Sequence, residues 1–546
     1  MARARGLASS AVCLLAAAGH PEPGLAQATE MRGSPLKAEL PGWATNWSPL
    51  ARVADLAREL PSGPAFPDLL SFPAPRVGLF WTVGNPASLP LELEDARVEF
   101  RAGARGASGD YARPLDPGDP SSGAISTMGW RPLGDRGAVI GSAVFDRTTF
   151  GDSLFADVQL PHSSNPFVVM DTIGDPVRRN AFRLEGATGR RFGKLSLGVA
   201  VGWEGQSNRT IASPVPRLDR TATPGATGGV VYEIGPRVRI GAHARWRQQR
   251  EFIQIATISQ PSRVFQIEGF EEPIPLDLQP NIFDRRFERN QYALGGSVGL
   301  DVLGGTWVVF GQREHAEEDQ FTNQREADPP TDRWDADGWT VGGAAQWGAA
   351  KERWLITLDA RYTTLEGEAF SANVRGIVFT VDEERFIGDL DARLGLGRGW
   401  RAGVHVGVRR DTDDRRDLLA QATSNIRSWQ GGAALELARV FSRRFAASIG
   451  GRFSSYGPSG EIPDPDDLGP VYRRFIGPGL ALQLAEAFNA AGTATLRFQA
   501  AERTGFWVRG QFAVLDPTGS SIPLLPTGTR RGWTFTAGAI LEEIWP

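Results

Sequence analysis

Side chains alternate between apolar and polar along residues 401–410, which read Arg-Ala-Gly-Val-His-Val-Gly-Val-Arg-Arg. Successive side chains of a β-strand point to opposite faces, so one face of this segment carries alanine and valine, and the other glycine, histidine and arginine. The pattern recurs from about Leu91 to the end of the chain, in segments of roughly ten or more residues separated by turn-rich loops. It is typical of an all-β, closed, antiparallel transmembrane β-barrel.

The N-terminus predicts export. Arg3 and Arg5 precede an uncharged run over residues 7–18, and a small-residue site follows that ends at Ala28. These features predict a cleaved signal peptide over residues 1–28. No later apolar run approaches the roughly twenty residues of a spanning helix, so a membrane-embedded form must be a barrel. We therefore expect the outer membrane of a Gram-negative bacterium.

The cysteine content and net charge of the chain limit its disulfides and its expected binding partners. The single cysteine, Cys13, lies inside the expected signal peptide, so the mature chain has no disulfide. The formal net charge of −4 gives no reason to expect a nucleic-acid partner. Membrane lipid, lipopolysaccharide, the barrel assembly machinery and a small-molecule solute are the partners we expect.

Residues 29–90 precede the repeating pattern and form a second region. Ser48 as N-cap, with Leu50, Val53 and Leu56 at helical spacing, predicts one amphipathic helix there. We expect a short periplasmic or lumen-plugging segment, either a simple extension or a gate. It is shorter than the plug of a TonB-dependent transporter, which argues against that class.

Loop lengths predict the topology of residues 91–546. Short connections are expected at 133–135, 188–191, 235–236, 304–305, 348–351, 397–399, 441–443 and 489–492. Long polar stretches are expected at 103–121, 151–180, 206–221, 253–286, 317–335, 367–381, 411–422, 457–469 and 516–529. Short periplasmic turns and long extracellular loops then give about 18 strands, within about 14–20. Residues 493–515 are either one long strand or a hairpin turning at 503–505.

The alternation also assigns the two faces. Aromatic residues near the ends of outward rows are expected at the lipid interfaces. They are Trp203, Trp246, Trp339, Trp347, Trp354, Tyr362, Trp400 and Trp533. The opposite rows are expected to line the lumen and a solute path. These candidates are Arg237, Arg239, His243, Arg245, Arg247, Asp359, Arg361, Asp389, Asp391, Arg393, Arg401, His405, Arg409, Arg452 and Arg509.

An arginine-rich lumen favours anionic solutes if water fills it. The alternative is that these charges form salt bridges between neighbouring strands, which stiffen the wall and select nothing.

No catalytic or cofactor motif is present. The histidines of the mature chain lack metal-site spacing, and no serine-hydrolase elbow or nucleotide-binding loop occurs in a strand-to-helix context. We therefore expect no enzyme, no metal and no cofactor. Two acidic clusters in expected outer loops, 411–414 and 464–467, are interpreted as solvated loops that could bridge lipopolysaccharide through divalent ions.

The closing segment Trp533-Thr534-Phe535-Thr536-Ala537 continues the alternation to the aromatic Trp545. Together with the expected signal peptide and the cysteine-free alternating segments, this closing segment makes the chain resemble Gram-negative outer-membrane β-barrels of a large uncharacterised class. The segment Asn85-Pro86-Ala87 is similar to one that precedes the first strand of long-chain fatty-acid-transporter-like barrels.

Three functions follow as hypotheses. The first is a channel or transporter for small solutes with an anion bias. The second, which the Asn85-Pro86-Ala87 resemblance implies, is uptake of hydrophobic compounds that leave sideways into the membrane. The third is a structural or assembly barrel that binds a surface partner through its long loops, such as 253–286.

Overall fold

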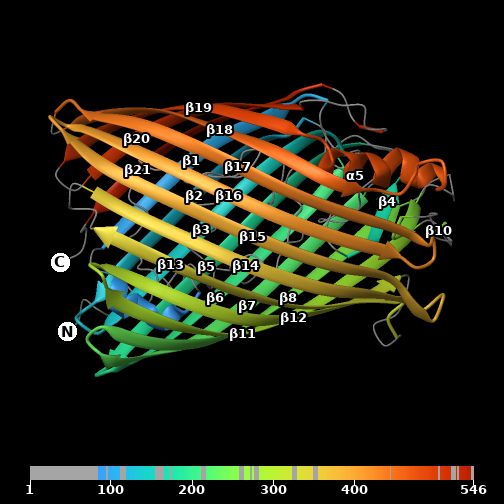
Figure 1. Ribbon diagram of the computed structural model, residues 1–546, viewed down its shortest axis with the longest axis horizontal. Helices are drawn as coiled ribbons and strands as arrows, with labels where there is room; N and C mark the ends of the chain where they lie inside the picture. The colour runs from blue at the N-terminus through green and yellow to red at the C-terminus, as the bar shows by residue number, and fades with distance from the viewer. Residues whose placement is uncertain are drawn as a thin grey trace.

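The computed structural model forms one large cylinder of strands (Figure 1). It describes residues 84–93, 96–110, 119–153, 165–171, 175–210, 217–256, 264–270, 274–275, 282–322, 329–348, 354–442, 444–501, 504–517, 524–525 and 528–542. The expected signal peptide, the expected helix near Ser48 and His162 lie outside these residues.

Eighteen antiparallel strands form the barrel wall. They are β1 (Arg97–Ser108), β2 (Ser121–Leu133), β3 (Gly137–Ser153), β5 (Asp175–Phe192), β6 (Leu195–Thr210), β7 (Arg217–Gly235), β8 (Val238–Ala256), β11 (Ile282–Val302), β12 (Gly305–Thr322), β13 (Asp332–Gly348), β14 (Trp354–Ser371), β15 (Gly376–Gly397), β16 (Trp400–Asp417), β17 (Ala422–Val440), β18 (Phe445–Glu461), β19 (Ala487–Ala501), β20 (Thr504–Pro517) and β21 (Arg530–Glu542). Each pairs with the next along the chain, and β21 pairs with β1, from Arg97↔Glu542 to Ser108↔Arg531. The predicted closed barrel and its strand number are confirmed.

Short connections gather at one end of the cylinder, where both ends of the barrel chain also lie (Figure 1). By the usual orientation of such barrels this end is periplasmic. The hairpin expected at 489–492 is wrong, because these residues lie within β19 and pair with β18 and β20. The hairpin joins β19 to β20 instead, close to the alternative at 503–505. The turn expected at 188–191 lies at Gly193-Lys194, where Gly193 adopts a left-handed φ of 64°.

Two of the long extracellular loops that we expected are tight turns. Strands β14 and β15 continue to residues 372–375, and β16 and β17 continue to 418–421. The acidic cluster at 411–414 therefore lies in β16, within the wall, and not in a loop. Polar residues there reflect a strand that continues beyond the bilayer, because about 9–11 residues suffice to span it and β15 has 22.

The outward rows carry the exposed apolar side chains, including Val406 and Val408 on β16 and Leu390 and Leu394 on β15. Above them on β16, toward the long-loop end, the same outward row continues with Arg410 and Arg416. The apolar belt thus covers the short-turn part of the wall, as a lipid-facing surface requires.

Smaller elements pack against the inside of the wall. Near the periplasmic end lie η1 (Pro86–Ser88) and α4 (Leu89–Glu92). At the extracellular end a three-stranded sheet is formed by β4 (Phe167–Asp171), β9 (Val264–Glu268) and β10 (Ile274–Pro275). The π-helix η2 (Tyr472–Ile476) continues into α5 (Gly477–Gln483) at the same end (Figure 1).

Candidate functional site: the barrel lumen

Asn85 anchors the chain segment inside the periplasmic end. Its side-chain Nδ2 donates to the carbonyl oxygens of Val230 on β7 and Ala242 on β8, at 3.0 and 3.2 Å. Its Oδ1 accepts from the backbone N–H of Ala87 at 3.1 Å and caps η1. Asn85 is fully buried, so these bonds fix the segment against the wall.

Glycines open the recess that receives this segment. Gly189, Gly198 and Gly229 lie opposite one another on β5, β6 and β7. A Cβ at Gly189 would lie 2.6 Å from Cδ of Pro90, and one at Gly198 or Gly229 would overlap Pro86 or Asn85. The row therefore has to be glycine for the segment to lie this close to the backbone of the wall.

Apolar packing completes the contact. Leu89 and Leu93 are buried in one cluster with Trp130 and Ile140 of the inner wall. Ala87 packs in a second cluster with Val231 and Phe310. The wall at this end is therefore apolar and is covered by the chain's own residues 85–93.

The middle of the lumen carries the charged rows that the alternation predicts. Arg239 contacts Asp301 at 2.8 Å, and Arg245 contacts Glu314 at 2.7 Å. Arg361 contacts Asp359, two residues away on the same strand, at 2.7 Å. These arginines thus bind carboxylates of the wall itself, and most of the bonds join different strands.

Both strand histidines face inward but are buried among neighbours. The Nε2 of His243 lies 2.9 Å from Oε1 of Gln312, and the ring covers Gly295. The Nδ1 of His405 lies 2.9 Å from Asp391, and its Nε2 lies 3.4 Å from Asp389. His405 has no exposed surface, so it supports the wall and does not face solvent in the lumen.

The other lumen candidates have varied positions. The expectation that Arg237 lines the lumen is wrong. Arg237 is an exposed residue of the turn between β7 and β8 and belongs to no strand row. Arg247 lies 3.9 Å from Glu204, and Arg409 contacts Asp411 at 2.5 Å. The remaining candidates lie on inward rows of β15, β16, β18 and β20: Arg393, Arg401, Arg452 and Arg509.

The extracellular mouth contains folded chain. We call β4, β9, β10, Phe270 and the helices η2 and α5 the mouth plug. Phe270 lies at its centre, where its ring meets Phe379 of the wall at 5.4 Å and Tyr472 of η2 at 6.1 Å between centroids. These rings belong to a buried cluster with Trp334 and Leu365 of the inner wall. The plug is therefore packed into the barrel and does not rest on its rim.

Polar bonds join the plug to the wall. The backbone N–H of Phe270 donates to Asp417 at 2.6 Å, and the left-handed Gly269 beside it leaves no space for a Cβ. Burial, together with the charge of Asp332, raises the pKa of Glu268 in β9 to about 7. Burial also raises the pKa of Tyr472, whose hydroxyl donates to the carbonyl oxygen of Pro463 at 2.9 Å.

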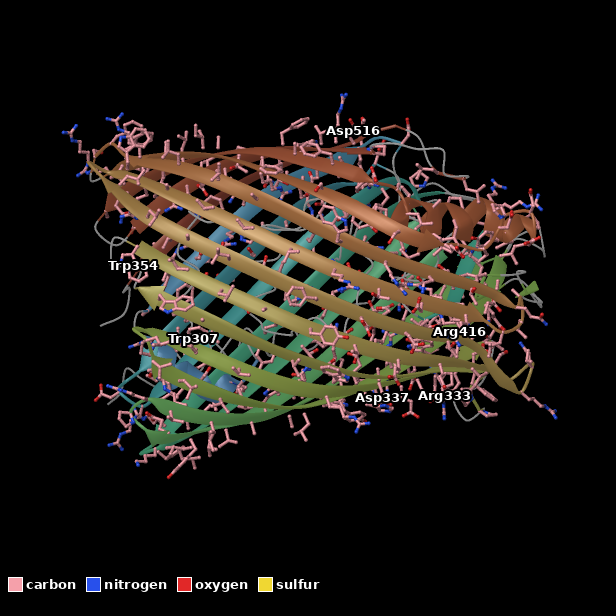
Figure 2. The ribbon with its side chains drawn as sticks, in the orientation of Figure 1. Trp307, Arg333, Asp337, Trp354, Arg416 and Asp516 are labelled. Atoms are coloured by element: carbon pink, nitrogen blue, oxygen red, sulfur yellow. The ribbon has the colours of Figure 1, made fainter. Side chains whose placement is uncertain are left out.

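The eight interface aromatics all lie on outward rows, in two bands. Trp347, Trp354 and Trp400 lie close to the short turns. The other five lie eight or nine residues from the short-turn ends of their strands: Trp203, Trp246, Trp339, Tyr362 and Trp533. Figure 2 shows Trp354 and Trp307 at the short-turn end and Arg333, Asp337 and Arg416 near the other.

The sequence reasoning missed several residues of these contacts. Trp307 pairs edge-to-face with Trp347 at 4.9 Å, and its place on an outward row could have been found from the alternation. We did not identify Glu314, Gln312 and Glu318 as wall residues, because they lie in a polar stretch that we interpreted as leading into the expected loop 317–335. Glu268 and Phe270 lie in the expected loop 253–286, where the apolar Phe270 suggested contact with a surface partner. The sequence does not show that folding brings both residues to the inner wall.

Among the residues that the structure describes, no group of three or more histidine, aspartate or glutamate side chains is placed to hold a metal ion. A search of the same residues for a helix long and apolar enough to cross a bilayer finds none.

Solved structures resemble this barrel only weakly. They include BauA, the ferric preacinetobactin receptor from Acinetobacter baumannii, at 8% identity and a TM-score of 0.37, with 81% of this chain and 80% of that chain covered. The copper transporter OprC has 9% identity and a TM-score of 0.40, covering 83% and 82%. YddB, an outer membrane transporter from Escherichia coli, has 9% identity and a TM-score of 0.37, covering 82% and 81%. These values are too low to carry a substrate or a mechanism to this chain.

No curated protein matches the sequence. None of these findings shows the likeness to fatty-acid-transporter-like barrels that Asn85-Pro86-Ala87 implied. A family model described as "Family of unknown function (DUF6850)" matches residues 86–541, which begin at the segment inside the lumen and end in β21. The chain is a member of this family.

Proposed function

We propose that this protein is a gated outer-membrane transporter for small solutes, with the barrel lumen as the path. The observation that carries the proposal is the presence of the chain's own packed segments inside both ends of the lumen. Residues 85–93 cover the inner wall at the periplasmic end, and the mouth plug covers it at the extracellular end. A path with folded segments at both ends suits regulated passage better than a permanently open pore.

The charge of the lumen gives only weak support to an anion preference. Arg239, Arg245 and Arg361 contact wall carboxylates at 2.8 Å or less, so their charge is largely compensated. We therefore expect a permeability ratio between anions and cations near one, with any departure toward anions.

Conductance of the mature protein in planar bilayers tests the proposal. We expect rare openings of the native protein and frequent openings of F270A, because loss of this buried ring removes its contacts with Tyr472 and with Phe379 and loosens the plug. F453A is the matched control, since Phe453 is exposed on the lipid-facing side of β18 and should not alter openings. If F270A is folded but silent under all voltages, the transport proposal fails.

Uptake of hydrophobic compounds is a second candidate, because the wall around Leu89 and Leu93 is apolar. Competition between a fluorescent fatty acid and unlabelled hydrophobic compounds for the detergent-solubilised protein would separate the two functions. Saturable binding would favour this candidate, and conductance without such binding would favour the first.

A further inference from the structure

A buried cluster of charges lies where the mouth plug meets the inner wall. The wall contributes residues from β8, β11, β12 and β13, and the plug contributes Glu268 from β9. The members are Glu251, Glu268, Arg285, Arg289, Glu318 and Asp332, with exposed fractions of 6%, 5%, 0%, 5%, 5% and 2%. Four carboxyl groups thus share buried space with two guanidinium groups.

Arg285 is the centre of the cluster. Its guanidinium donates to Gln266 of the plug and to Gln320 of β12, and it lies 3.6 Å from Asp332. Gln266 in turn donates to Glu268 at 2.5 Å and to Asp332 at 3.2 Å. One wall arginine therefore holds the plug strand β9 through a short chain of polar bonds.

The second arginine is already engaged elsewhere. Arg289 donates to Glu318 at 2.7 Å, and Glu318 also accepts from Asn165, just before β4 of the plug. Asp332 and Glu268 consequently depend on Arg285 for positive charge. Glu251 adds a further negative charge near Arg285, and Ser371 of β14 lies beside Glu268.

Charge balance makes a fully ionised cluster unfavourable. Glu268, Glu318 and Asp332 surround the guanidinium groups of Arg285 and Arg289. An excess buried negative charge would cost far more than protonating a carboxyl group, so at least one of these carboxyls holds a proton while the plug is docked. Glu268 is the member that the plug itself brings into the cluster. When the plug leaves, Glu268 returns to water and can ionise freely.

We propose that docking of the mouth plug is coupled to proton uptake at Glu268, so that the plug is held under acidic conditions and released as the external pH rises. The coupling concerns the docked and undocked states of the plug. Its consequence for solute passage rests on the proposed function.

The direction follows from the two environments of Glu268. Its pKa is about 7 in the docked state and near the ordinary 4.5 in water. Between these values the docked form keeps a proton that the undocked form has lost, so docking weakens as pH rises, by up to about tenfold in its equilibrium constant per pH unit. Above about pH 7 both forms are ionised and the dependence on this group ends.

Cysteine labelling measures the position of the plug directly. The mature chain has no cysteine, so A369C introduces a unique thiol on the inner wall, at a residue that is fully buried in the cluster around Phe270. V374C, half exposed at the β14–β15 turn, reports the intrinsic pH dependence of the maleimide reaction. We expect the labelling rate of A369C, divided by that of V374C, to rise at least about threefold from pH 5.5 to pH 7.5.

Variants of the cluster identify the proton site. E268Q mimics the protonated side chain, so the ratio should stay low and independent of pH. D332N removes a neighbouring negative charge and leaves Glu268 as the closer partner of Arg285, so the pKa of Glu268 should fall. The pH-dependent increase in the labelling ratio should therefore move to lower pH. E317Q is the control, because Glu317 lies next to Glu318 on β12 but on the outer face, 3.8 Å from Arg333; it should behave like the native protein. Retention of the compact barrel in unheated gels shows that each variant is folded.

A ratio that does not change with pH in the native background, or a rise that E268Q retains, would overturn the proposal. Conductance of the same samples keeps the two proposals distinct. A pH-dependent ratio in a barrel that never conducts would leave proton-coupled docking standing and reject transport. Conductance with a labelling ratio that does not change with pH would support transport and reject proton-coupled docking.

Discussion

Glu366 illustrates what individual residues add to the outer surface above the apolar belt. It lies directly opposite Asp337 on β13 and Asp382 on β15, and Asp382 in turn lies opposite Asp414 on β16. Like charges opposite one another on a sheet destabilise it. The sequence shows the abundance of carboxylates, but their alignment depends on the register of four strands.

We predict that E366Q stabilises the barrel by about 0.2–1 kcal/mol, because it removes one charge from the middle of this row. The free energy of unfolding in urea at low salt measures the effect, which should shrink at high salt. E288Q is the control, since Glu288 contacts Arg286 at 3.1 Å and its neutralisation should not stabilise. Equal effects of the two variants would contradict the repulsion.

At the scale of elements, strand phase was easier to predict than strand length. The aromatic and arginine rows of β14 and β16 follow from strict alternation. The ends of these strands do not, because Asp411 and Asp413 are residue types common in loops, and only the folded wall shows that they pair with Arg385, Arg409 and Arg415. The glycine row under residues 85–93 is likewise visible only once β5, β6 and β7 are paired.

We predict that G229A displaces the segment at the periplasmic end, since a Cβ there would overlap the side chain of Asn85. G228A is the matched control, because a Cβ at Gly228, on the opposite face of the same strand, meets nothing within 4 Å. With S88C as a buried reporter, G229A should speed maleimide labelling several-fold and G228A should not. Unchanged labelling in folded G229A would show that the segment tolerates the contact.

The whole molecule combines a closed wall with a lipid-facing belt. Closure through β1 and β21 leaves no free strand edge in the barrel sheet, which is the condition for a β-protein in a membrane. The belt occupies only the short-turn part of long strands, so the rest of the wall stands above the bilayer.

We predict that V406R destabilises the barrel in lipid vesicles by about 2–4 kcal/mol, since Val406 is exposed within the belt. T412R, six residues farther along the same outward row and above the belt, should cost about 0–1 kcal/mol. Equilibrium unfolding in vesicles compares the two. Similar costs would place the membrane boundary elsewhere on β16.

The sequence by itself determined the closed antiparallel barrel, its strand number and the face to which most side chains point, because a period of two is set locally by the strand backbone and lipid tolerates only apolar outward rows. Tertiary structure alone decided which inward charges bind one another, how residues 85–93 enter the glycine recess, and that Glu268 and Phe270 meet the wall. These contacts join residues that are far apart in the chain, as Phe270 and Asp417 are, so they depend on barrel closure and loop packing that no local pattern encodes.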